Sequence, residues 1–186
     1  MFLRNLEDHL ALMSRLHPLA EPVERAGRTL AQVLGQGGKL LLCGNGGSAA
    51  DSQHIASELT GRLVKDRRPL AAIALTTDSS ALTCIGNDYS FDDVFVRPLQ
   101  ALGHPGDALL AMSTSGNSGN VIKAVEAARA MGITTIGLLG RDGGRLASLC
   151  DQALVVPGQD TARIQEAHIL IGHTLCNMIE AELGLA

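Results

Sequence analysis

Apolar residues follow two alternating patterns along the chain: short unbroken runs, and longer stretches with helical spacing. The short runs predict strands over residues 39–43, 71–75, 108–112, 134–139 and 153–156. The apolar residues in these runs are consecutive rather than at every second position. We therefore expect each strand to be buried on both faces, as in a parallel sheet covered by helices on either side. The pattern predicts a three-layer α/β/α fold with a five-stranded parallel sheet.

The first part of the chain reads as helix rather than strand. Over residues 1–36, apolar positions such as Leu3, Leu6 and Leu10 recur at spacings of three and four, with a break near Pro18. This predicts an N-terminal helical arm ahead of an α/β core at residues 37–186. No internal repeat or long linker separates the two, so we expect one domain.

The length and composition are those of one compact domain. With 186 residues and 46% hydrophobic positions, the chain can bury one substantial core. A net charge of −4, a single Tyr, three Phe and no Trp argue against nucleic acid as a partner, because that ligand needs clustered cations and stacking surfaces. We find no secretory signal and no apolar stretch long enough for a membrane span. The sequence predicts a cytoplasmic protein without a membrane partner.

The cysteines carry no recognisable chemistry of their own. Cys43, Cys84, Cys150 and Cys176 are widely separated and form no C-x-x-C pair. This spacing favours neither a zinc ribbon nor a redox dithiol. We expect four buried free thiols.

A glycine-rich segment, residues 44–50, follows the first predicted strand and opens a helix. Its glycines allow a ligand close to the backbone, and the helix N-terminus favours an anion. The spacing also matches the G-x-G-x-x-A dinucleotide pattern, but the acidic residue expected about 20 positions further on is missing, and Asp78 lies too far away. The segment predicts a phosphate or sugar site. The alternative is a tight turn in which Ser48 caps the helix.

A serine-rich segment, residues 113–119, follows the third predicted strand. Its hydroxyl groups belong to Ser113, Thr114, Ser115 and Ser118. There is no Gly-Lys-Ser/Thr, so a nucleotide P-loop is excluded, and neutral donors with a helix dipole would have to hold the anion. This favours a monophosphate. The alternative is a polar loop that only caps a helix.

Two further pairs of polar residues are candidates for a site. His54 and Glu58 are four residues apart on a predicted helix, so they share a face and could reach one metal ion or one substrate. Such pairs are also common on solvated faces. Asn87 and Asp88 follow an apolar stretch and are candidates either to bind sugar hydroxyls or to form a turn.

A long terminal helix is predicted over residues 161–183. Its polar residues, set among aliphatic ones, are Arg163, Gln165, Glu166, His168 and His173. His173 is the most informative, because an imidazole on an apolar helix must be hydrogen-bonded, solvated or functional. A hydrogen-bonded core histidine is the alternative.

Together, these segments resemble the sugar isomerase (SIS) domain family. The likeness is carried, in chain order, by residues 43–48, 54–58, 86–88, 113–118 and 163–166. Within the family, the chain is similar to the sedoheptulose 7-phosphate isomerases over essentially its whole length. The resemblance implies a flavodoxin-like fold and a cytoplasmic homotetramer with active sites at subunit interfaces. It also implies conversion of the ketose phosphate to D-glycero-D-manno-heptose 7-phosphate, the first step towards ADP-heptose.

The resemblance also implies roles for individual residues. The phosphate would be held by Ser113, Thr114, Ser115 and Ser118. The sugar would contact Asn45, Gly46, Gly47, Glu58, Asn87, Asp88 and Gln165. Glu58 and His173 would be the acid/base pair. One zinc ion per site would be bound by His54, Glu58, Gln165 and His173.

The residue types fit the reaction. Aldose–ketose interconversion moves a proton between adjacent carbons through an enediolate, so it needs a base and a proton donor. A carboxylate and an imidazole supply both. Zinc would polarise the carbonyl, but direct ligation would lower the basicity of Glu58. Gln165 and His173 are about 12 Å apart along one helix, so one ion needs both side chains to lean inwards, or contributions from two subunits.

Two non-catalytic functions are alternatives on the same fold. A SIS protein that binds the bacterial replication initiator shares the glycine-rich, serine-rich and terminal-helix motifs. As the family pattern suggests, it lacks the carboxylate and imidazole matched here by Glu58 and His173, which favours the enzyme. A sugar-phosphate sensor would carry a DNA-binding domain or a basic arm, and neither is recognisable in these 186 residues.

Overall fold

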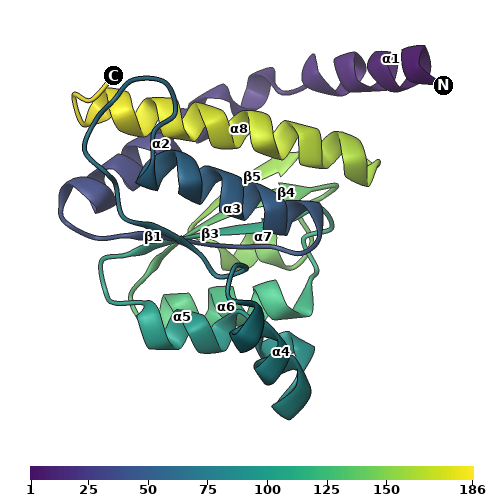
Figure 1. Ribbon diagram of the computed structural model, residues 1–186. Coiled ribbons are helices and arrows are strands. Elements are labelled where there is room, and N and C mark those ends of the chain that lie inside the picture. Colours follow the sequence, from purple (N-terminus) through teal and green to yellow (C-terminus); the bar gives the residue numbers. More distant parts are fainter.

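A five-stranded parallel sheet forms the middle layer of the computed structural model, which describes residues 1–186 (Figure 1). Its strands are β1 (Leu40–Cys43), β2 (Ala72–Ala74), β3 (Ala108–Ser113), β4 (Thr134–Gly140) and β5 (Gln152–Val156). They lie in the order β2-β1-β3-β4-β5, and every neighbouring pair is parallel. The predicted three-layer α/β/α fold is confirmed.

Helices cover both faces of the sheet (Figure 1). One layer holds α2 (Ala20–Gly35), α3 (Gly47–Thr60) and α8 (Thr161–Glu182). The other holds α4 (Ser79–Asp88), α5 (Val96–Leu102), α6 (Gly119–Ala130) and α7 (Leu146–Leu149), with a short 3₁₀ turn, η2 (Phe91–Asp93), after α4. No helix combines the length and the apolar character that crossing a membrane requires.

The strands divide their side chains between two cores. Leu40 and Leu42 of β1 belong to the core beneath α2, α3 and α8, whereas Leu41 and Cys43 belong to the core beneath α5 and α6. All four residues are at most 1% exposed. This alternation explains the unbroken apolar runs, because a strand between two helical layers has no solvent-facing side.

The N-terminal helices differ in how they pack. α1 (Phe2–Met13) ends before a 3₁₀ turn, η1 (His17–Leu19), as the break near Pro18 predicts. α2 lies against α8 so closely that a Cβ on Gly27 would come within 2.8 Å of the Met178 side chain. Only α1 therefore projects as an arm, while α2 is part of the helical layer (Figure 1).

The strand order fixes where a ligand can bind. The chain runs from β1 outwards to β2, then returns to β3 on the other side of β1. In such sheets the connections diverge at the carboxyl ends of the two central strands and leave a crevice there, as in the flavodoxin-like order. The glycine-rich and serine-rich segments follow β1 and β3. Both predicted loops therefore lie at the switch point of the sheet.

One expectation about the cysteines is wrong. Cys43 and Cys176 are buried, but Cys150 is only partly buried and Cys84 is exposed. Ile85 is the only buried residue of α4, and its neighbour Cys84 lies on the exposed part of this short helix. All four are free thiols, as expected.

Candidate active site

The glycine-rich turn brings backbone, rather than side chains, to the end of β1. Gly46 has φ +56°, a conformation that favours glycine, and no side chain caps the start of α3. A Cβ on Gly44 would lie 2.7 Å from the Cβ of Ser48. Ser48 is buried within the first turn of α3, so the alternative in which it caps the helix is wrong.

The serine-rich loop gathers the hydroxyl groups of its three serines at the start of α6. The Oγ atoms of Ser113 and Ser118 are 2.9 Å apart, and that of Ser115 lies 3.4 Å from Ser113. Gly116 has φ +67°, and a Cβ there would overlap the carbonyl group of Gly143. The loop is therefore held tightly against the loop after β4. Neutral donors at a helix N-terminus form an anion site without a cation.

A pair of side-chain amides joins the two loops. Asn45 donates from Nδ2 to Oδ1 of Asn120 at 2.9 Å, and Asn120 returns the bond to Asn45 at 2.8 Å. Asn120, in the first turn of α6, is 2% exposed and also accepts the backbone N–H of Val121. This pair fixes the spacing between the two loops.

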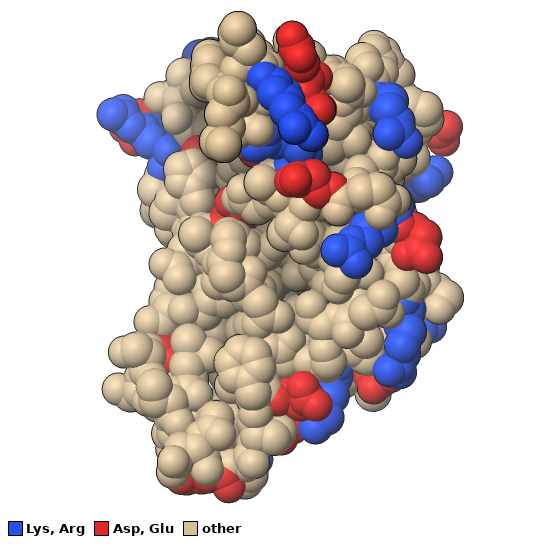
Figure 2. All heavy atoms as spheres, turned by 90° about the vertical axis from the view of Figure 1, so that its right-hand side faces the viewer, with Lys and Arg blue, Asp and Glu red and all other residues tan.

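A cavity opens beside the glycine-rich turn. Its volume is about 490 Å³, enough for a small sugar phosphate. Its lining residues are Gly44, Asn45, Gly46, Ala49, Thr76, Leu82, Thr83, Gly86, Phe91, Val94 and Phe95. Figure 2 shows one edge of the molecule, where the middle of the face is hollowed and tan, and the charged side chains of both signs lie mainly above it, below it and to its right.

Asn87 and Asp88 form the last turn of α4 rather than a separate turn. Both are exposed, and Asn87 donates from Nδ2 to Oδ1 of Asp88 at 2.7 Å. That hydrogen bond, with one from Cys84, lowers the pKa of Asp88. The adjacent Gly86 lines the cavity, so this turn lies at its rim. Their contact with sugar hydroxyls stays a prediction.

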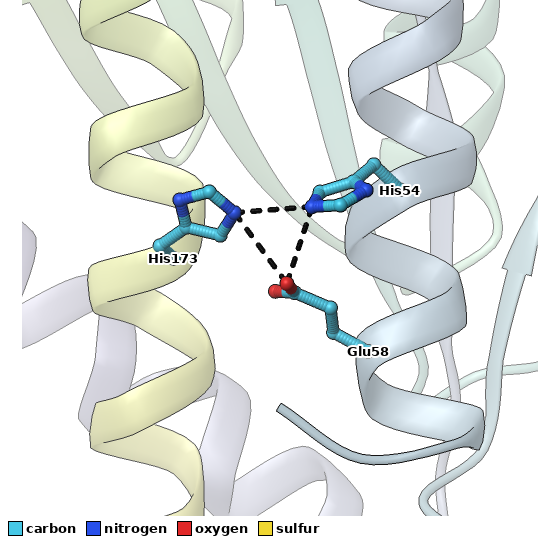
Figure 3. A group of neighbouring side chains, drawn as sticks. All are labelled: His54, Glu58 and His173. Carbon is cyan, nitrogen blue, oxygen red and sulfur yellow. Dashed lines mark hydrogen bonds and ion pairs between the residues drawn. The ribbon is translucent and has the colours of Figure 1, made fainter. Parts of the chain in front are cut away.

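Three predicted residues meet between α3 and α8 (Figure 3). The Nε2 atoms of His54 and His173 are 3.1 Å apart. Oε1 of Glu58 lies 3.2 Å from Nε2 of His54 and 3.4 Å from Nε2 of His173. We call these residues the triad. His54 and His173 are 119 residues apart in the chain, so it is the fold that brings His173 to the other two residues.

The triad combines a sheltered carboxylate with two accessible rings. The Glu58 side chain is 12% exposed, whereas His54 and His173 are 53% and 40% exposed. The alternative that His173 is a core histidine is therefore wrong. The second carboxylate oxygen of Glu58, Oε2, is buried and has no hydrogen-bond partner. Glu58 thus presents one oxygen to the imidazoles and keeps the other from water.

Gln165 approaches the same region from an earlier turn of α8. Its Nε2 donates to both oxygens of Asp51, at 2.6 and 2.7 Å. A carboxylate only accepts, so the amide nitrogen faces Asp51 and the amide oxygen is left for another partner. Burial raises the pKa of Asp51, against the opposing effects of the Gln165 hydrogen bond and the nearby His54 and His173.

Gln165 also adjoins the glycine-rich turn. A Cβ on Gly47 would lie 3.3 Å from Cγ of Gln165. Asn45 and Gly46 of the same turn line the cavity, whereas the triad residues do not. The turn therefore separates the cavity from the triad, with Gln165 beside it.

The remaining histidine of α8 has a structural role. His168 is fully buried, and its Nε2 is 3.1 Å from the carbonyl oxygen of Leu139 at the end of β4. Burial lowers the pKa of His168 to about 4, although the bond to Leu139 opposes this. A ring that is neutral and enclosed ties α8 to the sheet instead of exchanging protons with a ligand.

The triad fits a metal ion in its donor spacing. Two imidazole nitrogens and a carboxylate oxygen all lie within 4.8 Å of one another. Zinc bonds of about 2.0–2.1 Å in a tetrahedron require donor atoms about 3.3–3.4 Å apart. The three separations of 3.1, 3.2 and 3.4 Å come close to this. Ligation by Gln165 stays a prediction.

Comparison with known proteins identifies the family. The sequence family model of the SIS domain matches residues 5–140 of this chain. The phosphoheptose isomerase of Aliarcobacter butzleri is 58% identical over 91% of this chain and 89% of its own length. That of Helicobacter hepaticus is 54% identical over 95% of this chain and 90% of its own. The chain belongs to the phosphoheptose isomerases of the SIS domain family.

Solved structures agree with this assignment. A phosphoheptose isomerase from Neisseria gonorrhoeae superposes with a TM-score of 0.92 at 48% identity, covering 97% of each chain. The predicted SIS fold and the predicted isomerase are confirmed. The sugar isomerase domain of an RpiR transcription factor from Sphaerobacter thermophilus shares only the fold, at 17% identity and a TM-score of 0.65. Fold alone does not separate the enzymes of this family from its regulators.

Sequence reasoning missed two residues of the site. Asp51 precedes His54 by one helical turn, so the shared face of α3 could have indicated it. Asn120 lies just beyond the serine-rich segment, in a Gly-Asn pair that reads as an ordinary helix start. Its partner Asn45 is 75 residues away, and no local pattern predicts such a contact.

Proposed function

We propose that this protein is a cytoplasmic isomerase that interconverts sedoheptulose 7-phosphate and D-glycero-D-manno-heptose 7-phosphate, the first step towards ADP-heptose. The observation that carries the proposal is the triad: a carboxylate and two imidazoles meet within hydrogen-bonding distance between α3 and α8. The phosphoheptose isomerase relatives support the substrate class. We propose that residues 1–186 act as one domain.

Glu58 is the proposed base and His173 the proposed acid. The reaction removes a proton from the carbon next to a carbonyl and returns one to the neighbouring carbon, while the oxygens exchange a proton. Glu58 presents Oε1 on the exposed side of the α3–α8 seam, and the His173 ring lies 3.4 Å from it. A base and an acid at this separation can act on two adjacent atoms of one substrate.

The serine-rich loop holds the phosphate in this proposal. The hydroxyls of Ser113, Thr114, Ser115 and Ser118, with the backbone N–H groups at the start of α6, supply the donors. The sugar chain then runs along the glycine-rich turn, past Asn45, Gly46 and Gly47, towards Gln165 and Glu58. Asn87 and Asp88 bind hydroxyl groups at the rim. A phosphate far from the reacting carbons serves to orient them.

Zinc is the metal that we propose for the triad. Two histidines and a carboxylate are a common catalytic zinc set, which leaves an open position for substrate. His54, Glu58 and His173 would hold the ion, with the free amide oxygen of Gln165 as the proposed further ligand. Ligation lowers the basicity of Glu58 and removes the proton from Nε2 of His173, so metal binding and proton transfer at these atoms are alternative roles, which metal removal separates. Bound zinc polarises a carbonyl oxygen and stabilises an enediolate.

We also propose a homotetramer whose active sites lie between subunits. α1 exposes an apolar stripe in which Leu3, Leu6 and Leu10 are 69%, 41% and 58% exposed. α1 is held against α8 by the 2.7 Å contact of His9 with Glu166. An apolar helix face in an ordered position is suited to a second copy of the chain. Sedimentation should give the mass of four 19.4 kDa chains, and replacing the three leucines by serine should lower it.

The direct test is an assay of aldose heptose phosphate formation from sedoheptulose 7-phosphate. The purified protein is assayed as prepared, after treatment with a chelator, and after zinc is added back. We expect turnover that the chelator removes and zinc restores.

The outcomes separate the proposals. Turnover that survives complete metal removal contradicts the zinc site but keeps the isomerase. No turnover by a folded oligomer, with or without zinc, contradicts the isomerase and favours a protein that binds the replication initiator or senses a sugar phosphate. A mass below the tetramer contradicts only the assembly.

A further inference from the structure

A buried ion pair joins the two helices that carry the triad. Arg67, in the loop after α3, donates from Nε to Oε1 of Glu180 on α8 at 2.8 Å. The side chains are 2% and 5% exposed. Taking two charges out of water is costly unless geometry and further hydrogen bonds compensate. The remaining donors of Arg67 show what this ion pair does.

Arg67 caps the C-terminal end of α3. Its Nη2 donates to the carbonyl oxygen of Glu58 at 2.6 Å. Its Nη1 donates to the carbonyl oxygens of Leu59 and Gly61 at 2.7 and 2.9 Å. The last carbonyls of a helix have no partners within it, so helix ends fray unless they are capped. The positive charge also complements the negative end of the helix dipole.

Glu58 lies in this last turn of α3. The helix ends at Thr60, so the residue proposed as base is where fraying begins. The guanidinium that holds the backbone of Glu58 is itself anchored to α8 through Glu180. His173 lies seven residues before Glu180, about 10 Å along the same helix. One side chain therefore ties the backbone of the base to the helix of the acid.

Cys176 marks how close the ion pair is to the triad. Burial, then the negative charges of Glu58 and Glu180, raise the pKa of Cys176 to about 12, and the Arg67 charge opposes them. His173, Cys176 and Glu180 follow at spacings of three and four, which places them on one stripe of α8. The ion pair and the triad are thus consecutive layers of one α3–α8 interface.

We propose that Arg67 and Glu180 are positioning residues, which fix the last turn of α3 against α8 and so set the distance between Glu58 and His173. The planar fork of arginine suits this role, because it serves a carboxylate and several carbonyl oxygens at once. A lysine at this position keeps the charge but cannot make all of these bonds. The kinetic consequence rests on the proposed isomerase, whereas the structural consequence does not.

The test compares Arg67→Lys and Glu180→Gln with the wild type by two measurements. The first is the amide hydrogen exchange of each segment. We expect Arg67→Lys to speed exchange in residues 57–61 and to leave β1 and β3 unchanged. The second is isomerase kinetics. We expect kcat to fall about 10- to 100-fold with KM within about 3-fold, because a displaced base loses transition-state alignment rather than substrate binding. Glu180→Gln should act in the same direction, but less.

Lys39→Met is the matched control. Lys39 and Asp107 form another shielded ion pair, with a 2.6 Å N–O distance and side chains that are 20% and 4% exposed. This pair lies just before β1 and β3, whereas the two loops of the candidate site follow the carboxyl ends of these strands. We expect Lys39→Met to lower the melting temperature without changing kcat or exchange in residues 57–61.

The results are separable. If Arg67→Lys keeps wild-type kcat, or loses no more than Lys39→Met well below both melting temperatures, the positioning role is overturned. If Arg67→Lys does not fold, Glu180→Gln decides, and wild-type kcat and exchange in that variant overturn the proposal. If the wild type has no isomerase activity, the proposed function fails, and unchanged exchange in residues 57–61 would still overturn the capping role by itself.

Discussion

The two halves of the candidate site are built differently. The phosphate cradle at the end of β3 is made of hydroxyl groups, backbone and glycine, on loops that neighbouring loops hold in place. The triad is made of ionisable side chains on two long helices, and a buried ion pair ties those helices together. One half has no charge of its own. The other contains a carboxylate and two imidazoles.

This difference separates binding from chemistry. A phosphate that only needs to be oriented is served by fixed neutral donors, which do not titrate near pH 7. Proton transfer needs groups that gain and lose protons, and these work only when their separation is controlled. We therefore expect substitutions in the cradle to change KM and substitutions in the triad to change kcat.

The largest effect is expected for Glu58→Gln. An amide of the same shape cannot take up the proton, so kcat should fall by about 10²- to 10⁴-fold while the protein stays folded. Turnover and circular dichroism measure the two quantities. The control is Glu126→Gln, on the exposed side of α6, whose carboxylate is 51% exposed. Near wild-type activity in Glu58→Gln would remove this residue from the role of base.

His173→Asn should follow with a loss of about 10²-fold in kcat. Asparagine keeps a polar group on α8 but does not titrate, so proton donation should fail while the melting temperature changes little. His17→Asn, in the exposed η1 turn, is the matched control. A variant that loses stability but keeps its turnover would contradict the proposed acid.

Substitutions in the phosphate cradle should weaken substrate binding rather than slow the chemical step. In Ser115→Ala and Ser118→Ala, each lost hydrogen bond to a charged phosphate should raise KM about 10-fold, with kcat nearly unchanged. Ser148→Ala, whose hydroxyl bonds only to the backbone of Arg145 in our structure, is the control. A fall in kcat with unaltered KM would break the division between the two halves.

The smallest expected effect concerns His168, the structural counterpart of His173. Its folded pKa is about 4, against 6.5 for a free histidine. Between these values the unfolded chain takes up a proton that the folded protein does not. The stability that the neutral ring contributes is thus complete above pH 6.5 and is lost as pH falls towards 4. The loss amounts to about 3 kcal/mol.

Urea unfolding of the wild type and His168→Gln between pH 7 and 4 measures this contribution. The variant should be less stable at pH 7, and its free energy of unfolding should fall less steeply as the solution becomes acidic. Because both proteins contain the other titrating groups, the contributions of those groups cancel in the difference. They include Asp51, whose raised pKa makes the folded state more stable as pH falls, opposite to His168. Parallel curves would contradict the assigned role of His168.

The fold was largely predictable because a strand that is buried on both faces has consecutive apolar residues, and this pattern can be seen in the sequence. The runs at 108–112 and 134–139 correspond to β3 and β4 with one residue added at each carboxyl end. Ser113 ends β3, where hydrogen bonding to β4 continues although the residue is polar. The exposed Cys84 was mispredicted, because residue type indicates burial only on average.

The site was predictable in its parts but not in its connections. His54 and Glu58 were indicated by helical spacing, but their meeting with His173 depends on the packing of α3 against α8. In the sequence, Arg67 belongs to a short basic run with Lys65 and Arg68, and charged runs of this kind usually lie on a solvated surface. Its partner Glu180 is 113 residues away. Long-range pairs of this kind leave no periodic signal in a single sequence.

Neither the glycine-rich segment nor the serine-rich segment contains Lys or Arg, and this has a kinetic consequence. A cationic pocket draws anions in from a distance, and its capture rate falls as salt screens that attraction. The cavity beside the glycine-rich turn has no charged lining residue, and it belongs to a molecule with a net charge of −4. Without a long-range attraction for the phosphate, the rates of ligand binding and release should vary little with ionic strength. The same neutrality provides no cation for the further phosphates of a triphosphate or a nucleic acid.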